Sequence, residues 1–347
     1  MAPVELPAII SVRLIIMRFD LQHFNKKVLL TGAGFSRNWG GRLAREMWEE
    51  IFSHRAIQQR PTLRTLLLRT PFFENALAEI TDAKAYDEQD RTVMELAVGE
   101  AFERMDAEHA AQLSSSSPKI DGGSLRQLLG WFYSSEHRVG YIFSLNQDLL
   151  MERLAGFRVD VGVAQSPIFP GFVNAPLALP GFHYSPVSPP EISERTLAGN
   201  LNYIKLHGSF RWPLTDGSPG MVLGGGKEIA IGRSPLLSWY QQLFSQIICS
   251  GDVRLLIIGY SFQDDHINRI IWTATQSFGA RIFIWDTRDP LELLENVRIA
   301  EPAFPRRTID LRPYLCGAAS RPLGEVFPAN GHTTPEFRRI EASFLGV

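Results

Sequence analysis

The chain alternates between continuous apolar runs and segments whose apolar residues recur at helical spacing. Runs that are apolar on both faces are typical of strands in a sheet covered by helices on both sides. Helical stripes recur over residues 43–52, 236–247 and 267–271. This alternation predicts an α/β fold with a doubly wound, mostly parallel, Rossmann-like sheet. The predicted strands are Val28–Thr31, Val139–Leu145, Tyr203–Leu206, Val253–Ile258 and Ile282–Trp285.

The longest stretch without a predicted strand lies between the first two of these runs. It carries helical patterns, so we expect an inserted helical lobe over about residues 50–137. The domain that contains it would span residues 25–290. Residues 1–24 would form an N-terminal extension, in which Met17 is an alternative start, and residues 291–347 a C-terminal tail available as an interaction surface.

A second irregular segment, Ser166–Pro190, is rich in proline. Proline interrupts helices and central strands because it lacks a backbone N–H group and its ring fixes φ. We therefore expect a loop here. Two roles stay open for this loop, a lid across the mouth of a site and a tolerated surface excursion.

Composition narrows the class of protein. The 347 residues carry a net charge of −2 and are 45% hydrophobic, which is globular and disfavours direct nucleic-acid binding. The two cysteines, Cys249 and Cys316, exclude a disulfide framework and a cysteine zinc module, and they fit a reducing cytoplasm. No apolar run is long enough for a membrane helix, so we expect a cytoplasmic protein without a membrane segment.

Four polar or glycine-containing motifs follow the predicted strands. In a parallel sheet the carboxyl ends of the strands lie along one edge, where ligands bind. We therefore expect the four motifs to converge. They are Gly32-Ala33-Gly34-Phe35-Ser36, Leu145-Asn146-Gln147-Asp148, Leu206-His207-Gly208-Ser209 and Ile258-Gly259-Tyr260-Ser261-Phe262.

The first motif suits a phosphate-binding turn. Gly32 and Gly34 allow the backbone to approach a pyrophosphate at the start of the next helix, although a purely structural tight turn needs the same residues. A dehydrogenase would carry a third glycine at the sixth position of the motif, where this chain has Arg37. Hydride transfer is therefore disfavoured.

Together the four motifs resemble those of sirtuins, and more closely those of the sirtuin-like domains of bacterial antiphage systems. Trp212 after the third motif, and Asp264 and His266 after the fourth, are similar to that branch. The resemblance implies NAD as substrate and a sirtuin-type fold. The four zinc-binding cysteines of sirtuin deacylases are missing, which favours NAD hydrolysis over protein deacylation.

The resemblance also implies roles for individual residues. His207 would be the general base, Asn146 would position water or the ribose, and Asp148 would hold the nicotinamide end. Alternatively, His207 is a structural group, Asn146 caps a turn and Asp148 caps the helix after it. The residues expected to contact the rest of NAD are Gly32, Ala33, Gly34, Phe35, Ser36, Gly259, Ser261 and Asp286.

The function expected from this resemblance is that of an NAD glycohydrolase, an NAD-depleting effector of antiphage defence. Its activation would come from homo-oligomer assembly or from a partner such as a hexameric ATPase, an Argonaute-like module or another sensor. Hydrolysis, cyclisation and ADP-ribosyl transfer share the same first step and stay open. The alternatives are a non-catalytic NAD or ADP-ribose sensor and an atypical protein deacylase.

We expect no metal ion, because no group of His, Asp and Glu residues has the spacing of a metal site along the sequence. The interpretation also makes a geometric demand. The imidazole of His207 must face a nucleotide cavity beside the glycine turn at residues 32–34.

Overall fold

A computed structural model describes most of the chain. The expected N-terminal extension and most of the proline-rich segment at 166–190 lie outside the described residues, so the predictions made for them stay predictions. The described ranges are 24–82, 85–116, 120, 122–156, 168–173, 185–186, 197–213, 219–224, 226–300, 308–327 and 333–346.

The main sheet has seven strands in the order β13-β10-β9-β1-β3-β2, with β6 also pairing with β3. Every pair is parallel except β2 with β3. The five strands predicted from the sequence are neighbours in it, so the doubly wound, mostly parallel sheet is confirmed. The strands are β1 (Lys27–Thr31), β2 (Tyr133–Ser134), β3 (Val139–Ser144), β6 (Leu201–Lys205), β9 (Arg254–Ile258), β10 (Arg281–Trp285) and β13 (Leu315–Ala319).

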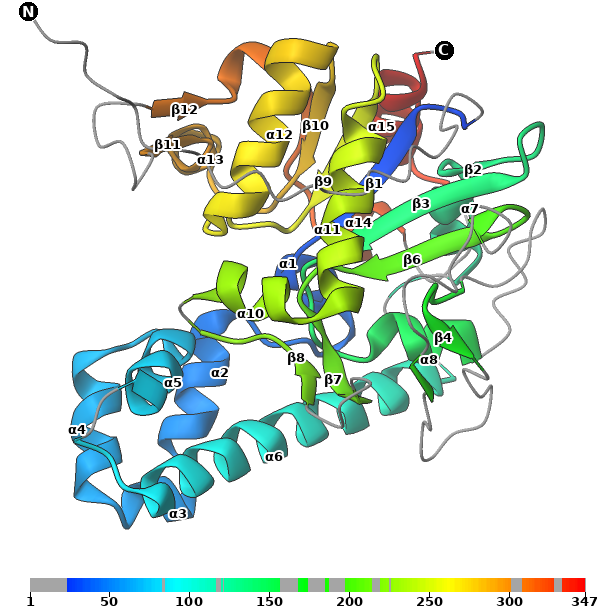
Figure 1. Ribbon diagram of the computed structural model, residues 1–347. Helices are drawn as coiled ribbons and strands as arrows, with labels where there is room; N and C mark the ends of the chain where they lie inside the picture. The colour runs from blue at the N-terminus through cyan, green and yellow to red at the C-terminus, as the bar shows by residue number, and fades with distance from the viewer. Residues whose placement is uncertain are drawn as a thin grey trace, which may run out of the picture.

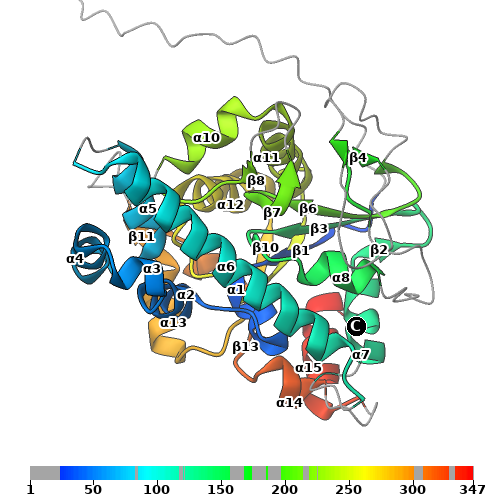
Figure 2. The ribbon, with the colours of Figure 1, turned by 90° about the horizontal axis from the view of Figure 1, so that it is seen from below.

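Helices cover both faces of this sheet, which is why its strands are apolar on both sides (Figure 2). On one face, Phe244 of α11 packs against Phe143 of β3 with ring centroids 4.8 Å apart. On the other, Phe344 of α15 lies 5.3 Å from Phe283 of β10. The first layer contains α11 (Pro235–Ile248) and α12 (Asp265–Phe278), and the second α7 (Gly122–Gly130), α14 (Leu323–Val326) and α15 (Pro335–Leu345).

The predicted helical insertion forms a lobe with its own core, and in Figure 1 it hangs below the sheet. The buried apolar residues of this core run from Met47 to Met105. The lobe therefore ends earlier in the chain than residue 137, the C-terminal limit expected from the sequence. The reason is that α7 packs on the sheet through Leu125, Leu128 and Leu129. The lobe helices are α2 (Ala44–Phe52), α3 (Arg55–Gln58), α4 (Pro61–Arg69), α5 (Phe73–Asp82) and α6 (Glu88–Leu113).

The long helix α6 connects the lobe to the sheet. Phe102 stacks on Phe210 with ring centroids 5.3 Å apart. Asp106 forms a buried ion pair with Arg153, whose Nη2 lies 2.6 Å from Oδ2. The lobe is thereby held beside the segments that follow β3 and β6.

Smaller elements complete the described chain, and none of its helices combines the length and the apolar character needed to cross a bilayer. The short helices are α1 (Ala33–Ser36), α8 (Leu150–Gly156), α10 (Lys227–Arg233), α13 (Pro290–Asn296) and the 3₁₀ turns Arg37–Trp39 and Arg312–Tyr314. The strand pairs are β4 (Phe172–Val173) with β5 (Ser185–Pro186), β7 (Gly208–Pro213) with β8 (Pro219–Met221), and β11 (Arg298–Ala300) with β12 (Thr308–Asp310).

The sheet continues beyond residue 290, where the sequence suggested that the domain ends. β13 pairs in parallel with β10, and α15 buries Phe337, Ile340 and Phe344. Short or glycine-containing strands such as Leu315–Ala319 give a weak sequence signal, which explains why this edge strand was not predicted. Much of the C-terminal segment therefore belongs to the core.

This packing predicts the effect of truncating Phe344, which is 1% exposed and touches Phe132 and Phe283. Phe344→Ala leaves a cavity in the main core and lowers the free energy of unfolding by about 3–5 kcal/mol. Leu291→Ala is the control, because Leu291 is 75% exposed and its change stays within about 0.5 kcal/mol. Urea unfolding measures both variants, and equal stabilities would show that α15 is not part of the core.

Candidate functional site

The glycine turn after β1 and the turn after β9 are packed backbone against backbone. Gly32 N donates to Ile258 O at 2.9 Å, and Gly34 N donates to Gly259 O at 3.0 Å. A Cβ atom on Gly32 would lie 2.5 Å from Gly259 O, and one on Gly34 2.7 Å from the Gly259 Cα atom. Gly259 itself has a φ of +64°. The first and fourth motifs therefore form one unit that only glycine permits.

Asn146 joins the second motif to this unit. Its Nδ2 donates to Gly32 O at 3.0 Å and to Ser36 Oγ at 2.8 Å. The backbone N of Asn146 donates to Ser144 Oγ at 3.1 Å, and Asn146 is only 6% exposed. The amide thus bridges both ends of the short helix α1.

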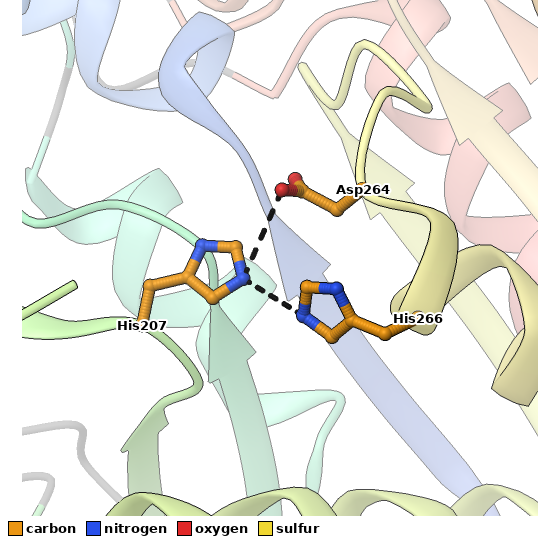
Figure 3. A group of neighbouring side chains, drawn as sticks. All are labelled: His207, Asp264 and His266. Atoms are coloured by element: carbon orange, nitrogen blue, oxygen red, sulfur yellow. Dashed lines mark hydrogen bonds and ion pairs between the residues drawn. The ribbon is translucent and has the colours of Figure 1, made fainter. Parts of the chain in front are cut away.

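His207 follows β6 and is 1% exposed. Its Nε2 lies 3.1 Å from Nε2 of His266 and 3.9 Å from Oδ1 of Asp264, and Figure 3 shows the two imidazoles pointing at one another. Burial lowers the pKa of His207 to about 3, although the Asp264 carboxylate acts in the opposite direction. The imidazole is therefore neutral at neutral pH.

Lys227 supports this cluster from the start of α10. Its Nζ lies 2.9 Å from Oδ1 of Asp264 and 2.8 Å from Oε2 of Glu74, which belongs to the lobe helix α5. Burial acts to raise the pKa of Asp264, but interactions with its neighbours, including the charge and hydrogen bond of Lys227, outweigh burial and lower that pKa. Asp264 is thus an ionised carboxylate that connects the lobe, α10 and the turn before α12.

Asp148 has a capping contact, because its Oδ1 accepts a hydrogen bond from Leu150 N at 3.0 Å at the start of α8. This is the helix-cap arrangement considered from the sequence. Its backbone carbonyl also accepts a hydrogen bond from the ammonium group of Lys205. The role at the nicotinamide end stays a prediction.

Lys205, Glu152 and Ser209 form a buried polar cluster that sequence reasoning missed. Lys205 Nζ and Ser209 Oγ each lie 2.9 Å from Oε1 of Glu152, and the side chains of Lys205 and Glu152 are 0% exposed. Burial raises the pKa of Glu152, and the lysine opposes that rise. The signal in the sequence was a lysine one residue from the end of an otherwise apolar strand. This cluster ties the second motif to the third.

The remaining predicted residues lie at the same edge with different surroundings. Phe35 is 1% exposed and packs on Trp39 in the core, with ring centroids 5.3 Å apart. Ala33 and Ser261 are exposed. Asp286 is paired with Arg288, with Nη2 and Oδ2 2.6 Å apart, and Arg288 also donates to Tyr260 O at 2.8 Å.

The four motifs converge, yet the demand for an open cavity is not met in the described residues. Asn146 contacts the glycine turn directly, and the imidazole of His207 faces His266 and Asp264 rather than a nucleotide-sized space. The physical reason is that the Asn146 amide and the His207 imidazole both have polar partners within the protein. We call these internal contacts of Asn146 and His207 the closed arrangement.

Within the described residues, a surface pocket of about 670 Å³ lies beside α2 in the lobe, away from the four motifs. It is lined by charged side chains that pair with one another, such as Arg42 with Glu50 at 3.2 Å and Arg37 with Glu46 at 2.6 Å. Mutual pairing leaves little net charge to attract a nucleotide.

Comparison with known proteins adds a family. A family model described as SIR2-like domain matches residues 141–302, a range that contains the second, third and fourth motifs. This part of the chain is therefore similar to a SIR2-like domain. The first motif lies N-terminal to this range and joins the SIR2-like domain through Gly259 and Asn146. Among curated proteins, none matches the sequence of this chain.

Solved structures similar to the chain include a Sir2 homologue in complex with NAD. It is 15% identical, has a TM-score of 0.40, and the match covers 93% of this chain and 92% of that one. A mutant Sir2 homologue with ADP-ribose is 15% identical, with a TM-score of 0.38 and coverage of 92% and 93%. A structure on sirtuin substrate affinity is 13% identical, with a TM-score of 0.39 and coverage of 92% and 94%.

The buried Lys205–Glu152 pair predicts a large single-mutant effect. Lys205→Met leaves the Glu152 carboxyl group buried without its partner and lowers the free energy of unfolding by about 3–5 kcal/mol. The double variant with Glu152→Leu removes both charges and recovers most of this loss. Urea unfolding of the three proteins measures the difference. A single variant as stable as the wild type would show that the pair does not hold these motifs together.

His109 on α6 predicts a pH dependence. It is 0% exposed, neither ring nitrogen has a hydrogen-bond partner in the described residues, and burial lowers its pKa. The unfolded chain therefore binds a proton there at higher pH than the folded chain does, so wild-type stability falls as pH falls below about 6.5. His109→Leu removes this loss, so its stability relative to the wild type rises from pH 7 to pH 5, by up to about 1.4 kcal/mol per pH unit. A constant difference across this range would contradict the prediction.

Proposed function

We propose that the SIR2-like domain cleaves the nicotinamide–ribose bond of NAD and releases nicotinamide and ADP-ribose. The observation that carries this proposal is the meeting of the glycine turn, Asn146 and His207 at one sheet edge, from segments far apart in the sequence. The match to a SIR2-like domain and the solved Sir2 homologue that contains NAD support the choice of substrate.

The chemistry asks for few groups. The leaving nicotinamide departs as a neutral molecule from a pyridinium, so its departure requires no general acid. The enzyme must grip the ribose, stabilise the developing oxocarbenium charge and supply a base. In the proposed mechanism the neutral imidazole of His207 takes a proton from water or from a ribose hydroxyl, and the Asn146 amide orients that group.

The other predicted residues would hold the rest of NAD. The backbone from Gly32 to Phe35 with Ser36 would receive the pyrophosphate, and Gly259 and Ser261 would approach the adenosine ribose. Asp286 would lie at the adenosine side, and Asp148 at the nicotinamide. Each of these assignments needs the closed contacts at Asn146 and His207 to open first.

The closed arrangement suits an enzyme that is held inactive. A His207 imidazole whose pKa is about 3 is a weak base, and exposure to water would return that pKa toward about 6.5. Opening would therefore admit NAD and activate the base together. The turn from Phe262 to Asp264 is the segment that would move, since Phe262 is a non-glycine residue with a φ of +61°.

We further propose that this opening is the regulated step of a cytoplasmic antiphage effector. A constantly active NAD-consuming enzyme would kill its host, which is why assembly into a homo-oligomer or a partner from the same defence system would trigger it. The catalytic unit would be residues 25–290 with the β13 and α15 segments, and the exposed side of the lobe helices would receive the trigger.

Substitution of His207 tests the activity. The wild-type chain, with and without the product of its neighbouring gene, is incubated with NAD, and nicotinamide release is measured by chromatography. His207→Ala lowers the rate by roughly 10²- to 10⁴-fold with NAD binding retained, because a general base contributes about this factor. His137→Ala, a histidine in the turn before β3, is the control and keeps the wild-type rate.

The same experiment separates the alternatives. NAD binding without nicotinamide release in either condition overturns the proposal and supports a sensor. Release only after addition of an acyl-lysine peptide supports a deacylase instead. The products distinguish hydrolysis from cyclisation and from ADP-ribosyl transfer.

A further inference from the structure

The cluster of His207, Asp264 and His266 has a second property, which is separate from its place beside the glycine turn. The three side chains each offer one metal-ligating atom, and these atoms all lie within 4.8 Å of one another (Figure 3). They come from two segments, because His207 follows β6 while the other two residues lie at the start of α12. His207 and His266 are buried, and the Asp264 side chain is 15% exposed.

The distances suit a small divalent ion. Tetrahedral zinc sites have metal–ligand bonds of roughly 2.0–2.1 Å, so neighbouring ligand atoms lie about 3.3 Å apart. The two Nε2 atoms are already 3.1 Å apart, and Oδ1 of Asp264 is 3.9 Å from Nε2 of His207. A small rotation of the Asp264 carboxylate would bring three ligand atoms to the spacing of a tetrahedral site.

The protonation of the cluster also fits. A histidine ligand must be neutral, and burial lowers the pKa values of both His207 and His266. Nε2 of His207 faces Nε2 of His266, so it is the nitrogen of His207 that would hold the ion.

Charges around the cluster favour a cation. The carboxylates of Asp264 and Glu74 face the ammonium group of Lys227, so these three groups sum to one negative charge. Farther out, Glu228 is paired with Arg269 and adds no net charge. With the Asp264 ligand included, these groups therefore offset one of the two positive charges of a divalent ion.

We propose that His207, Asp264 and His266 bind one divalent transition-metal ion of the zinc class, with a fourth position left for water. Two imidazoles with one carboxylate select this class over Mg²⁺ and Ca²⁺, which prefer oxygen ligands. This metal site differs from the sequence-based expectation of no metal, since residues 207 and 264–266 meet only in the folded chain.

A consequence for regulation rests on the proposed function. The bound ion takes the lone pair on His207 Nε2 that a general base needs. It also fastens the turn before α12 to the end of β6, which is the closed arrangement described above. Binding of the ion therefore stabilises the inactive state, and its removal is a step toward activity.

Metal binding is tested directly on the full chain by equilibrium dialysis against Zn²⁺, in a Cys249→Ser, Cys316→Ser background that removes both thiols. We expect one ion per chain. Loss of a residue that only hydrogen-bonds to a metal ligand weakens metal binding by roughly 10- to 100-fold. His266→Gln and Asp264→Asn each remove a ligand itself, so we expect each to weaken Zn²⁺ binding by more than this. His54→Gln is the matched control, because His54 also contacts a carboxylate, Glu100, but no second histidine.

The outcomes are distinct. The metal site is overturned if the parent chain binds no Zn²⁺, or if His266→Gln and Asp264→Asn bind it as the parent does. Circular dichroism of each variant checks that it is folded. Because the two variants remove different ligands, both must lose Zn²⁺ affinity for the metal site to stand.

Nicotinamide release measured with Zn²⁺ and with a chelator tests the regulatory consequence. Zn²⁺ lowers the rate of the parent chain at least 10-fold and leaves that of His266→Gln nearly unchanged; equal rates in the parent would overturn the inactivating role. Zn²⁺ binding together with no NAD cleavage, even with the chelator and the product of the neighbouring gene present, would leave the metal site standing and overturn the proposed function. NAD cleavage without Zn²⁺ binding would support the proposed function and overturn the metal site.

Discussion

The close backbone contact between the turn after β1 and Gly259 sets the positions of most groups in the site. A Cβ atom at Gly32, Gly34 or Gly259 would lie 2.5–2.7 Å from backbone atoms of the opposite turn. Neighbouring parallel strands bring the two turns together, and the absence of side chains lets them touch. Asn146 then finds the carbonyl of Gly32 within reach, so three of the four motifs are positioned by this one contact.

The third motif is held by a different interaction, the buried pair of Lys205 and Glu152. Its two charges are fully inaccessible and share Ser209, so the end of β6 is fixed relative to α8. His207, two residues after the lysine, is thereby aimed at the start of α12. The internal hydrogen bonds that stabilise these buried polar groups also keep the site closed. A group that is bonded within the protein is not available to bind a ligand.

Much of the architecture could be predicted from local patterns. Apolar runs such as Val253–Ile258 are rich in β-branched residues, so they identified the central strands, and helical spacing identified α2, α11 and α12. Weaker elements escaped: β13 contains glycine and alanine, and α7 packs on the sheet although it follows the lobe. Local pattern says what an element is, whereas its layer depends on partners distant in the sequence.

For the site, local pattern was enough to show which residue types follow the strands, because glycines and polar residues there interrupt apolar runs. The folded chain was needed to show that Asp264 and His266 turn toward His207 and that His207 is only 1% exposed. The reason is that residues 207 and 266 are separated along the chain by β7, β8, α10, α11 and β9. Their distance is set by how helices pack on the sheet, and no spacing in the sequence encodes that packing.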